Sequence, residues 1–368
     1  MRFLMFSAVL SGFRTIFSQS GLPWVVWGLA MVMASIAGVA QSFEIEDQRQ
    51  FGPANNAVAP DVLRVLSTTD TDLLAPLIES FLNTRPTTAV DYVAVSSAEL
   101  MRAVVDENAG FDLAVSSALD LQTKLANDGY TQAHRSTATA QLPVWGNWRD
   151  HVFAFSQEPA SIVLSPVAFE GLELPRSRQA LMSLLRRYPN RFRDRIGTYD
   201  VEKSGLGYLF ATQDLRTSES FWRMMEIFGS LDVQLYCCSG EMIEAVAKGE
   251  IAIAYNVLGS YARARTDLTG LIEIVDPQDY TNMMLRTAVV LRQAERPDLA
   301  GAFIDHLLRA AWGERADPAY PFPRYPSGLA SQEASLRPIQ MGPGLLVFLD
   351  HLKRLRFLDE WRSAVLQK

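Results

Sequence analysis

The feature that most constrains the fold of this chain is a regular alternation of short apolar strands with amphipathic helices after residue 60. The segment "VLRVLS" reads as a strand beginning at Val62 and runs directly into "DTDLLAPLIESFLNTR", whose apolar residues recur at helical spacing. The strand-like segments "AVDYVAV" and "FDLAVS" are each followed by another helical segment. Alternating strand and helix units predict a parallel sheet with helices packed on its faces.

The chain is long enough to form two such lobes. It has 368 residues, of which 48% are hydrophobic. A second set of strand and helix units follows, with "RIGTYDV", "VQLY" and "IAIAYNV" as strands, and "VFAFSQEPASIVLSP" reads as a long, bent strand pair. We therefore predict an α/β fold in which residues 61–157 and 279–368 form the first lobe and 158–278 the second. Strands near 153–164 and 274–290 should cross between the lobes as a hinge.

The N-terminal residues have the pattern of an export signal. Arg2 and Arg14 precede the apolar run "LPWVVWGLAMVMASIAGVA", and small residues around Ala40 suit a signal-peptidase site. We expect residues 1–42 to be a signal peptide and the mature protein to be periplasmic. Because the run is about long enough to span a bilayer, an uncleaved membrane anchor stays open. Residues 43–60 are expected to be a flexible leader.

Charge and motifs narrow the possible functions. The net charge of -7 argues against a nucleic-acid partner. The four histidines show no metal-ligand spacing, and we see no Walker loop, G-x-G-x-x-G or G-x-S-x-G, so neither a metal, a cofactor nor an enzyme is expected. The two cysteines, Cys237 and Cys238, are adjacent; we expect buried thiols, with a strained vicinal disulfide as the alternative.

Hydroxyl side chains recur where predicted strands give way to helices. Ser67 to Asp70 follow "VLRVL", Ser116 and Ser117 follow "FDLAV", and Ser239 follows "VQLYCC"; Ser204 precedes a fourth helix. A helix N-terminus offers free N–H groups and partial positive charge, which suit an anion. The alternative is that each is an ordinary N-cap, since Ser, Thr and Asp are the preferred caps.

These segments resemble the periplasmic solute-binding proteins of ABC transporters, of the ferric-ion type, over roughly residues 63–308. The element "SG…EAVAKGE…AIAYN" is the most specific part of the resemblance. It implies two α/β lobes that close on a ligand held in the cleft between them. Carried onto this sequence, the ligand contacts implied by the family's pattern are Ser67, Thr68, Thr69, Ser116, Ser117, Ser204, Gly205, Tyr208, Ser239, Gly240, Asn256 and Tyr261.

The sequence departs from the iron-binding members of that family. Those use adjacent tyrosines after the "AIAYN" strand, whereas Tyr255 and Tyr261 are separated here. A ferric site needs several hard anionic oxygens. The hydroxyl-rich turns instead favour a small anionic solute, an organophosphate or a carboxylate, as in the phosphoglycerate transport regulatory type. Arg286 is added as a candidate anion clamp or, alternatively, a structural ion pair. Asp70 is expected to cap its helix and point away from the ligand.

The expected function is therefore that of an extracytoplasmic binding protein, a monomer, that delivers its solute to the permease of an ABC transporter. Three alternatives stay open: a ligand-sensing adaptor for a membrane sensor kinase, a ferric-ion-binding protein, and a secreted enzyme on a related two-lobe fold. A last amphipathic helix, about Pro343 to Val365, is expected to pack on the first lobe.

Overall fold

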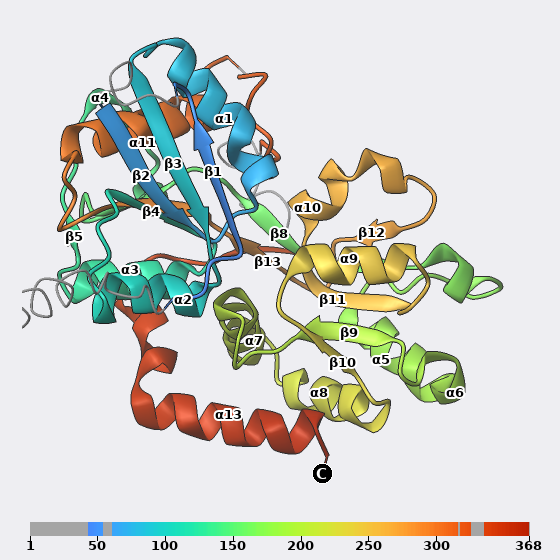
Figure 1. Cartoon of the computed structure of the whole chain (residues 1–368). Helices are drawn as coiled ribbons and strands as arrows, with labels where there is room; N and C mark the ends of the chain where they lie inside the picture. The colour runs from blue at the N-terminus through green and yellow to red at the C-terminus, as the bar shows by residue number, and fades with distance from the viewer. Residues whose placement is uncertain (1–42, 54–60, 316, 325–334, 368) are drawn as a thin grey trace, which may run out of the picture. The chain divides into compact units, whose positions relative to one another are not determined.

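The computed structural model describes residues 43–53, 61–315, 317–324 and 335–367 (Figure 1). Within these residues two sheets, each with helices on both faces, form the fold, which confirms the predicted two-lobe α/β architecture. None of the described helices combines the length and the apolar character needed to cross a membrane.

The first sheet has the strand order β1, β3, β2, β4, β14, β7, β6, with β5 paired beside β14. Its strands are β1 (Asp47–Phe51), β2 (Asp61–Ser67), β3 (Thr88–Ala94), β4 (Leu113–Ser116), β5 (Thr131–Gln132), β6 (Asn147–Trp148), β7 (Val152–Ala154) and β14 (Thr287–Leu291). As the alternation predicts, β3, β2 and β4 are parallel, so the turns that follow β2 and β4 lie at the same edge.

The helices of the first lobe bury the apolar stripes that the sequence shows. They are α1 (Thr71–Asn83), α2 (Ser97–Met101), α3 (Leu119–Asn127), α4 (Thr137–Ala140) and α11 (Pro297–Trp312). Residues of α1 and α11 share one hydrophobic core with β2 and β3, while α2 and α3 contribute to a second core on the other face of the sheet. The helix predicted for residues 96–108 continues past α2 as a π-helical turn, Arg102–Asp106.

The second sheet has the order β10, β9, β11, β8, β13, β15, with β12 paired beside β8. Its strands are β8 (Glu158–Leu164), β9 (Ile196–Tyr199), β10 (Gln234–Tyr236), β11 (Ile253–Leu258), β12 (Glu273–Val275), β13 (Thr281–Met284) and β15 (Leu336–Pro338). Here too the three predicted strands β10, β9 and β11 are parallel neighbours. The helices are α5 (Arg178–Arg187), α6 (Pro189–Phe192), α7 (Gly205–Thr217), α8 (Phe221–Ser230), α9 (Ser239–Ala247) and α10 (Gly259–Ala264).

The chain passes between the two sheets along segments close to those named as a hinge. β7 lies in the first sheet and β8 in the second, while β13 lies in the second and β14 in the first. Glu158 at the start of β8 and Arg286 between β13 and β14 stand at these crossings. They are joined by an ion pair of 2.9 Å.

Two predictions for the ends of the described region are wrong. Residues 47–51 of the expected flexible leader form β1, an edge strand antiparallel to β3, and Phe43 is buried against Phe111; residues 54–60 and the expected signal peptide lie outside the described residues. β1 was missed because four of its five residues are exposed and polar, so backbone pairing to β3 holds it rather than an apolar face.

The C-terminal segment also differs from the prediction. β15 pairs with β13 in the second sheet rather than completing the first lobe. The last helix is divided into a 3₁₀ segment η5 (Pro343–Leu349) and α13 (His351–Val365), and α13 packs in a core with α8 of the second lobe. Figure 1 shows α13, at the red end of the colour range, beside α8 and α7.

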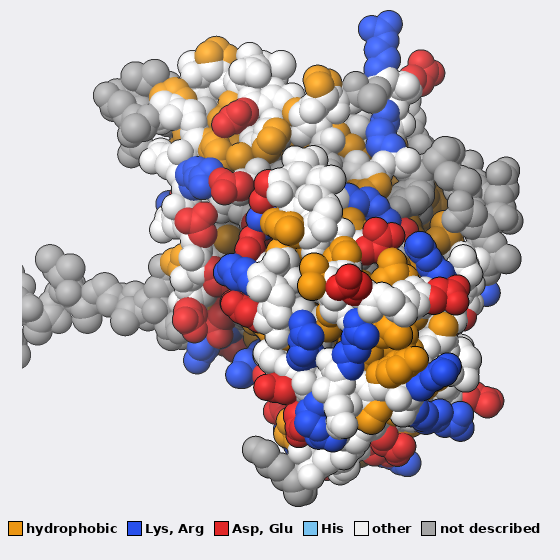
Figure 2. Space-filling view, turned by 90° about the vertical axis from the view of Figure 1, so that its right-hand side faces the viewer, with side chains coloured by type: hydrophobic (Ala, Val, Ile, Leu, Met, Phe, Trp, Pro, Cys, Tyr) orange, Lys and Arg blue, Asp and Glu red, His pale blue; other side chains and the backbone are white. Residues whose placement is uncertain are grey.

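Charges of both signs are mixed on the visible surface. On the face shown in Figure 2, Lys and Arg side chains alternate with Asp and Glu side chains and do not form one basic surface.

Candidate functional site

A cavity of about 400 Å³ lies where turns from both lobes meet. This volume falls within the range of small-molecule sites, about 300–1,000 Å³. The polar residues that line it from the first lobe are Glu44, Glu46, Thr68, Asp70, Ser96, Ser97, Glu99 and Ser117. Those from the second lobe are Tyr199, Glu202, Lys203, Ser204, Cys237, Cys238, Ser239 and Tyr261.

In the first lobe, the turns after the parallel strands β2 and β4 are joined to each other. The Thr68 hydroxyl lies 3.1 Å from that of Ser116, and its oxygen accepts the backbone N–H of Ser117 at 3.3 Å. Thr68 and Ser117 line the cavity, whereas Ser116 is not among its lining residues. Pairing of neighbouring parallel strands brings these turns together.

In the second lobe, Ser204 and Ser239 line the cavity in different ways. Ser204 is the N-cap of α7, and its hydroxyl oxygen accepts the N–H of Gly207 at 3.1 Å. The Ser239 hydroxyl accepts the N–H of Leu258 at 3.1 Å and lies 2.5 Å from the Tyr199 hydroxyl. Ser204 is therefore an ordinary N-cap, whereas Ser239 links the start of α9 to the end of β11.

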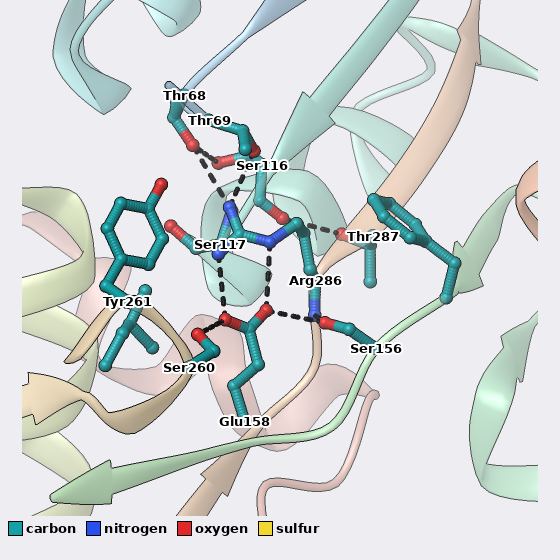
Figure 3. Close-up of polar contacts among 12 residues, drawn as sticks. Thr68, Thr69, Ser116, Ser117, Ser156, Glu158, Ser260, Tyr261, Arg286 and Thr287 are labelled. Atoms are coloured by element: carbon teal, nitrogen blue, oxygen red, sulfur yellow. Dashed lines mark hydrogen bonds and ion pairs between the residues drawn. The ribbon is translucent and has the colours of Figure 1, made fainter. Parts of the chain in front are cut away.

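Arg286 does not reach the cavity. It is fully buried and bonds both carboxylate oxygens of buried Glu158, at 2.9 and 3.0 Å, while a third nitrogen donates to the Thr69 hydroxyl at 2.6 Å. Ser156 and Ser260 donate to the same carboxylate. Figure 3 shows Arg286 at the centre of this network, below Thr69 and beside Tyr261. Arg286 is thus the structural ion pair given as its alternative.

Several other predicted contacts lie outside the cavity lining. Tyr208 donates to the carbonyl of Phe348 and holds the C-terminal segment. Asn256 donates to buried Asp214 at 2.8 Å. The remaining ones that do not line the cavity are Ser67, Thr69, Ser116, Gly205, Gly240 and Arg286.

The prediction for Asp70 is wrong. Asp70 occupies the N-cap position of α1, but its side chain makes no capping hydrogen bond and lines the cavity. Its backbone N–H donates to the Tyr261 hydroxyl across the cleft at 3.4 Å. The Thr71 hydroxyl donates to Asp47 of β1 at 2.5 Å, so the first turn of α1 is held by the edge strand that the sequence analysis missed.

Sequence reasoning also missed Glu44 and Glu46, because it placed them in a flexible leader. Glu44 and Glu46 alternate with Ile45 just before β1. This two-residue period is typical of a strand and could have indicated one here. With Asp70, Glu99 and Glu202 they make the lining rich in carboxylates, and Lys203 is the basic side chain among the described lining residues. Glu99 is engaged by Glu44 N–H and Arg102, and Glu202 by Arg362.

Glu46 and Asp70 make no ion pair within the described part of the chain. Desolvation by the surrounding protein raises the pKa of Asp70; nearby Arg286 opposes this and Asp72 adds to it. The pKa of Glu46 is raised by desolvation and then by the negative charges of Asp70, Glu44 and Glu241. A cationic group entering the cavity would relieve this repulsion.

One group of possible metal ligands adjoins the cavity. Among the described histidine, cysteine, aspartate and glutamate side chains, those of Cys237, Cys238 and Glu241 place donor atoms within 4.8 Å of one another. Both cysteines are free and exposed, so the expectation of buried thiols is wrong. Cys237 follows β10 and Cys238 is the N-cap of α9, so both lie where this helix begins rather than in a core.

Two α/β lobes joined by crossing strands, with a polar cavity at the meeting turns, define a two-lobe binding protein. The chain belongs to the bacterial extracellular solute-binding protein family, whose sequence profile matches residues 63–314. As the resemblance predicted, its structural neighbours include ferric-ion-binding members. Membership implies a small solute as ligand and the membrane permease of an ABC transporter as partner.

Solved structures support the same assignment. The substrate-binding protein of an ABC transporter from Agrobacterium tumefaciens is 31% identical, with a TM-score of 0.80 over 87% of this chain and 98% of that one. AfuA from Actinobacillus pleuropneumoniae, with fructose-6-phosphate bound, is 14% identical, with a TM-score of 0.64 over 83% and 98%. Iron-bound HitA from Pseudomonas aeruginosa is 15% identical, with a TM-score of 0.61 over 83% and 99%. No curated protein matched the chain.

Proposed function

We propose that this chain is the periplasmic solute-binding component of an ABC transporter and that its solute is a small zwitterion with a carboxylate or similar anionic group and an amine. The observation that carries the proposal is the lining of one cavity. Starts of α3, α7 and α9 meet there, together with the unpaired carboxylates of Glu46 and Asp70.

The anionic group is matched by the helix starts. Ser117, Ser204 and Ser239 precede or begin helices of nine or more residues, whose N-termini carry partial positive charge and free N–H groups. Lys203 adds a full positive charge beside Ser204. These features support the anion-binding part of the sequence-based expectation.

The cationic group is matched by the carboxylates. A solute with anionic groups alone, such as an organophosphate, would face the carboxylates of Glu46 and Asp70, and like charges at short range cost free energy. Since the same fold holds a sugar phosphate in AfuA and iron in HitA, the fold by itself does not choose between solutes. The carboxylates of Glu46 and Asp70 therefore support a solute that also carries a cationic group.

The test begins with native mass spectrometry of the purified protein, to detect a small molecule that travels with it. A thermal-shift panel then compares α- and ω-amino acids with the matched carboxylic acids that lack the amine and the matched amines that lack the acid. At 100 times its Kd a ligand stabilises the folded protein by about 2.7 kcal/mol, which raises the Tm by several degrees. Only zwitterions should do so.

A rise in Tm with inorganic phosphate or an amine-free carboxylate, equal to that with any amino acid, would contradict the zwitterion. Saturable binding of ferric ion with a tyrosinate absorption band, lost in Tyr261→Phe, would favour the iron alternative. Either result would leave the assignment to the solute-binding family unchanged, because that assignment does not depend on the solute.

A further inference from the structure

We propose that Cys237, Cys238 and Glu241 form a binding site for one thiophilic divalent cation, with Zn²⁺ as the matching ion, on the wall of the cavity. None of the three side chains is among those assigned above to the solute, so the inference does not depend on which solute is bound.

The three donor groups already converge. Their ligand atoms lie within 4.8 Å of one another, and the Cys237 sulfur is 3.5 Å from a carboxylate oxygen of Glu241. Donors around tetrahedral zinc, with bonds of about 2.0–2.3 Å, stand about 3.3–3.8 Å apart. Small side-chain rotations therefore bring the three atoms into a common coordination sphere.

The backbone beneath these side chains is rigid. Cys237 follows the last residue of β10, Cys238 is the N-cap of α9, and Glu241 lies in the first turn of that helix. Ser239 fixes this turn by accepting the N–H of Leu258 at 3.1 Å. A metal site gains from ligands held on a strand end and a helix start, because less ordering is needed on binding.

The fold offers no structural reason for cysteine at these positions. Cysteine is among the residues most often buried, yet both thiols are exposed. Cys238 stands where Ser, Thr, Asp or Asn would cap a helix, and it makes no side-chain capping bond. Residue types that a fold does not need are expected at functional sites.

The electrostatics favour a divalent cation. The Glu241 carboxylate lies beside both thiols, and the carboxylates of Glu46 and Asp70 line the same cavity, so the surroundings of the site are negatively charged. Cysteine thiols are ordinarily protonated at neutral pH. Binding forms two metal–sulfur bonds and one metal–oxygen bond, and releases the two thiol protons to solvent.

The donor set selects the kind of ion. Two thiolates and one carboxylate carry three negative charges and suit zinc, whereas Ca²⁺ and Fe³⁺ prefer oxygen ligands alone. Because both cysteines line the cavity, a fourth position would be open toward it, as in zinc sites with three protein ligands.

The experiment titrates the reduced full-length chain with Zn²⁺ by calorimetry, in buffers of different ionisation enthalpy. We expect one ion per chain, release of two protons, and protection of both thiols from a thiol-specific reagent. With Cd²⁺ as probe, a thiolate-to-metal charge-transfer band should appear in the ultraviolet.

Variants separate this site from the rest of the cavity. Cys237→Ser combined with Cys238→Ser should weaken Zn²⁺ binding by about 100-fold or more, and Glu241→Gln by about tenfold. Glu244→Gln, on the same helix but paired with Arg265, is the matched control and should change nothing. Unchanged thermal melting of each variant without metal shows that folding is intact.

Two results would overturn the proposal. One is Zn²⁺ binding that survives the double serine substitution but is lost in Glu46→Gln with Asp70→Asn, since the acidic lining would then be the site. The other is the absence of any stoichiometric Zn²⁺ binding by protein whose two thiols are shown to be reduced.

Discussion

Arg286 and Glu158 form a buried ion pair at the point where both crossing segments pass between the lobes. Neither side chain is exposed, and the side chains of Thr69, Ser156 and Ser260 make further hydrogen bonds to the pair. Removing one partner leaves a buried charge without compensation. We expect Arg286→Ala to lower the free energy of unfolding by about 3–5 kcal/mol, measured by chemical denaturation.

The control is Arg193→Ala, which removes an exposed pair with Asp232 of 2.6 Å. Exposed pairs contribute about 0–1 kcal/mol, because solvent screens them. If the two variants lost similar stability, the network around Arg286 would not be the stabilising element that its burial indicates.

The carboxyl group of Asp70 should make solute binding depend on pH. Its pKa is raised by desolvation, so it takes up a proton at higher pH than a free aspartate. As pH falls toward this raised pKa the carboxylate is neutralised, and its attraction for a cationic group is lost. We expect the affinity for the stabilising zwitterion to fall as the pH is lowered from neutral, and to begin falling at a higher pH than for a free aspartate, measured by calorimetry.

Asp70→Asn tests the same residue directly. A hydrogen bond to a charged group contributes about 1.5–3 kcal/mol, so the variant should bind about ten- to a hundredfold more weakly at pH 7 and show a smaller pH dependence. Asp72→Asn, two residues further along α1 and paired with Arg49, is the control and should behave as the original chain. Equal affinity in all three proteins would remove Asp70 from the site.

At the scale of elements, α13 is held by a few apolar side chains against α8. Trp361 is almost fully buried in the core of the second lobe, and Phe357 packs edge-on against Tyr208 with ring centroids 5.3 Å apart. We expect Trp361→Ala to cost about 3–5 kcal/mol of stability, since it leaves a large cavity.

Leu352→Ala in the same helix is the comparison, because Leu352 is 74% exposed. It should change the free energy of unfolding by no more than about 0.5 kcal/mol. A similar loss in both variants would mean that α13 is stabilised by helix propensity rather than by docking on α8.

The break in the C-terminal helix has a cause in the residues themselves. The three-residue spacing of the leucines at 346, 349 and 352 does not mark the break, because it continues to 355 and 358 inside α13. Asp350 leaves helical geometry at ψ 132°, and its side chain accepts the N–H of Lys353 as an N-cap. This cap, which required the structure, separates α13 from η5.

At the scale of the whole molecule, the lobes meet closely at Gly205. A Cβ atom at this residue of α7 would lie 2.6 Å from the Cβ of Ser97, which belongs to α2 in the first lobe. Real Cβ atoms do not approach so closely, so any side chain here must separate the two helix starts. We expect Gly205→Ala to disfavour the closed arrangement and weaken solute binding by about tenfold, a modest steric cost of about 1.4 kcal/mol.

Gly240→Ala is a matched control, because a Cβ there meets nothing within 4 Å. Small-angle scattering of both variants would report the lobe separation, and calorimetry the affinity. If Gly205→Ala kept the scattering profile and the affinity of the control, closure would not depend on this contact.

The positions of those strands and helices that depend on nearby residues could be predicted from the amino-acid sequence. Apolar periodicity predicted β2, α1, β3 and β4 within one or two residues, because a strand or helix buries side chains at intervals of 2.0 or 3.6 residues. It also placed the hydroxyl-rich turns at helix starts. Thr68, Ser117, Ser204 and Ser239 line the cavity because parallel strands end at one edge.

Which of these polar groups line the cavity and which make buried interactions depends on contacts between distant parts of the chain, so it required the three-dimensional structure. Arg286 is bound by Glu158, 128 residues away in sequence, and this ion pair holds its side chain away from the cavity. β1 carries no apolar stripe and is held by backbone pairing to β3, which brought Glu46 into the lining. Local periodicity reports burial on one element, whereas long-range pairing depends on how elements assemble in space.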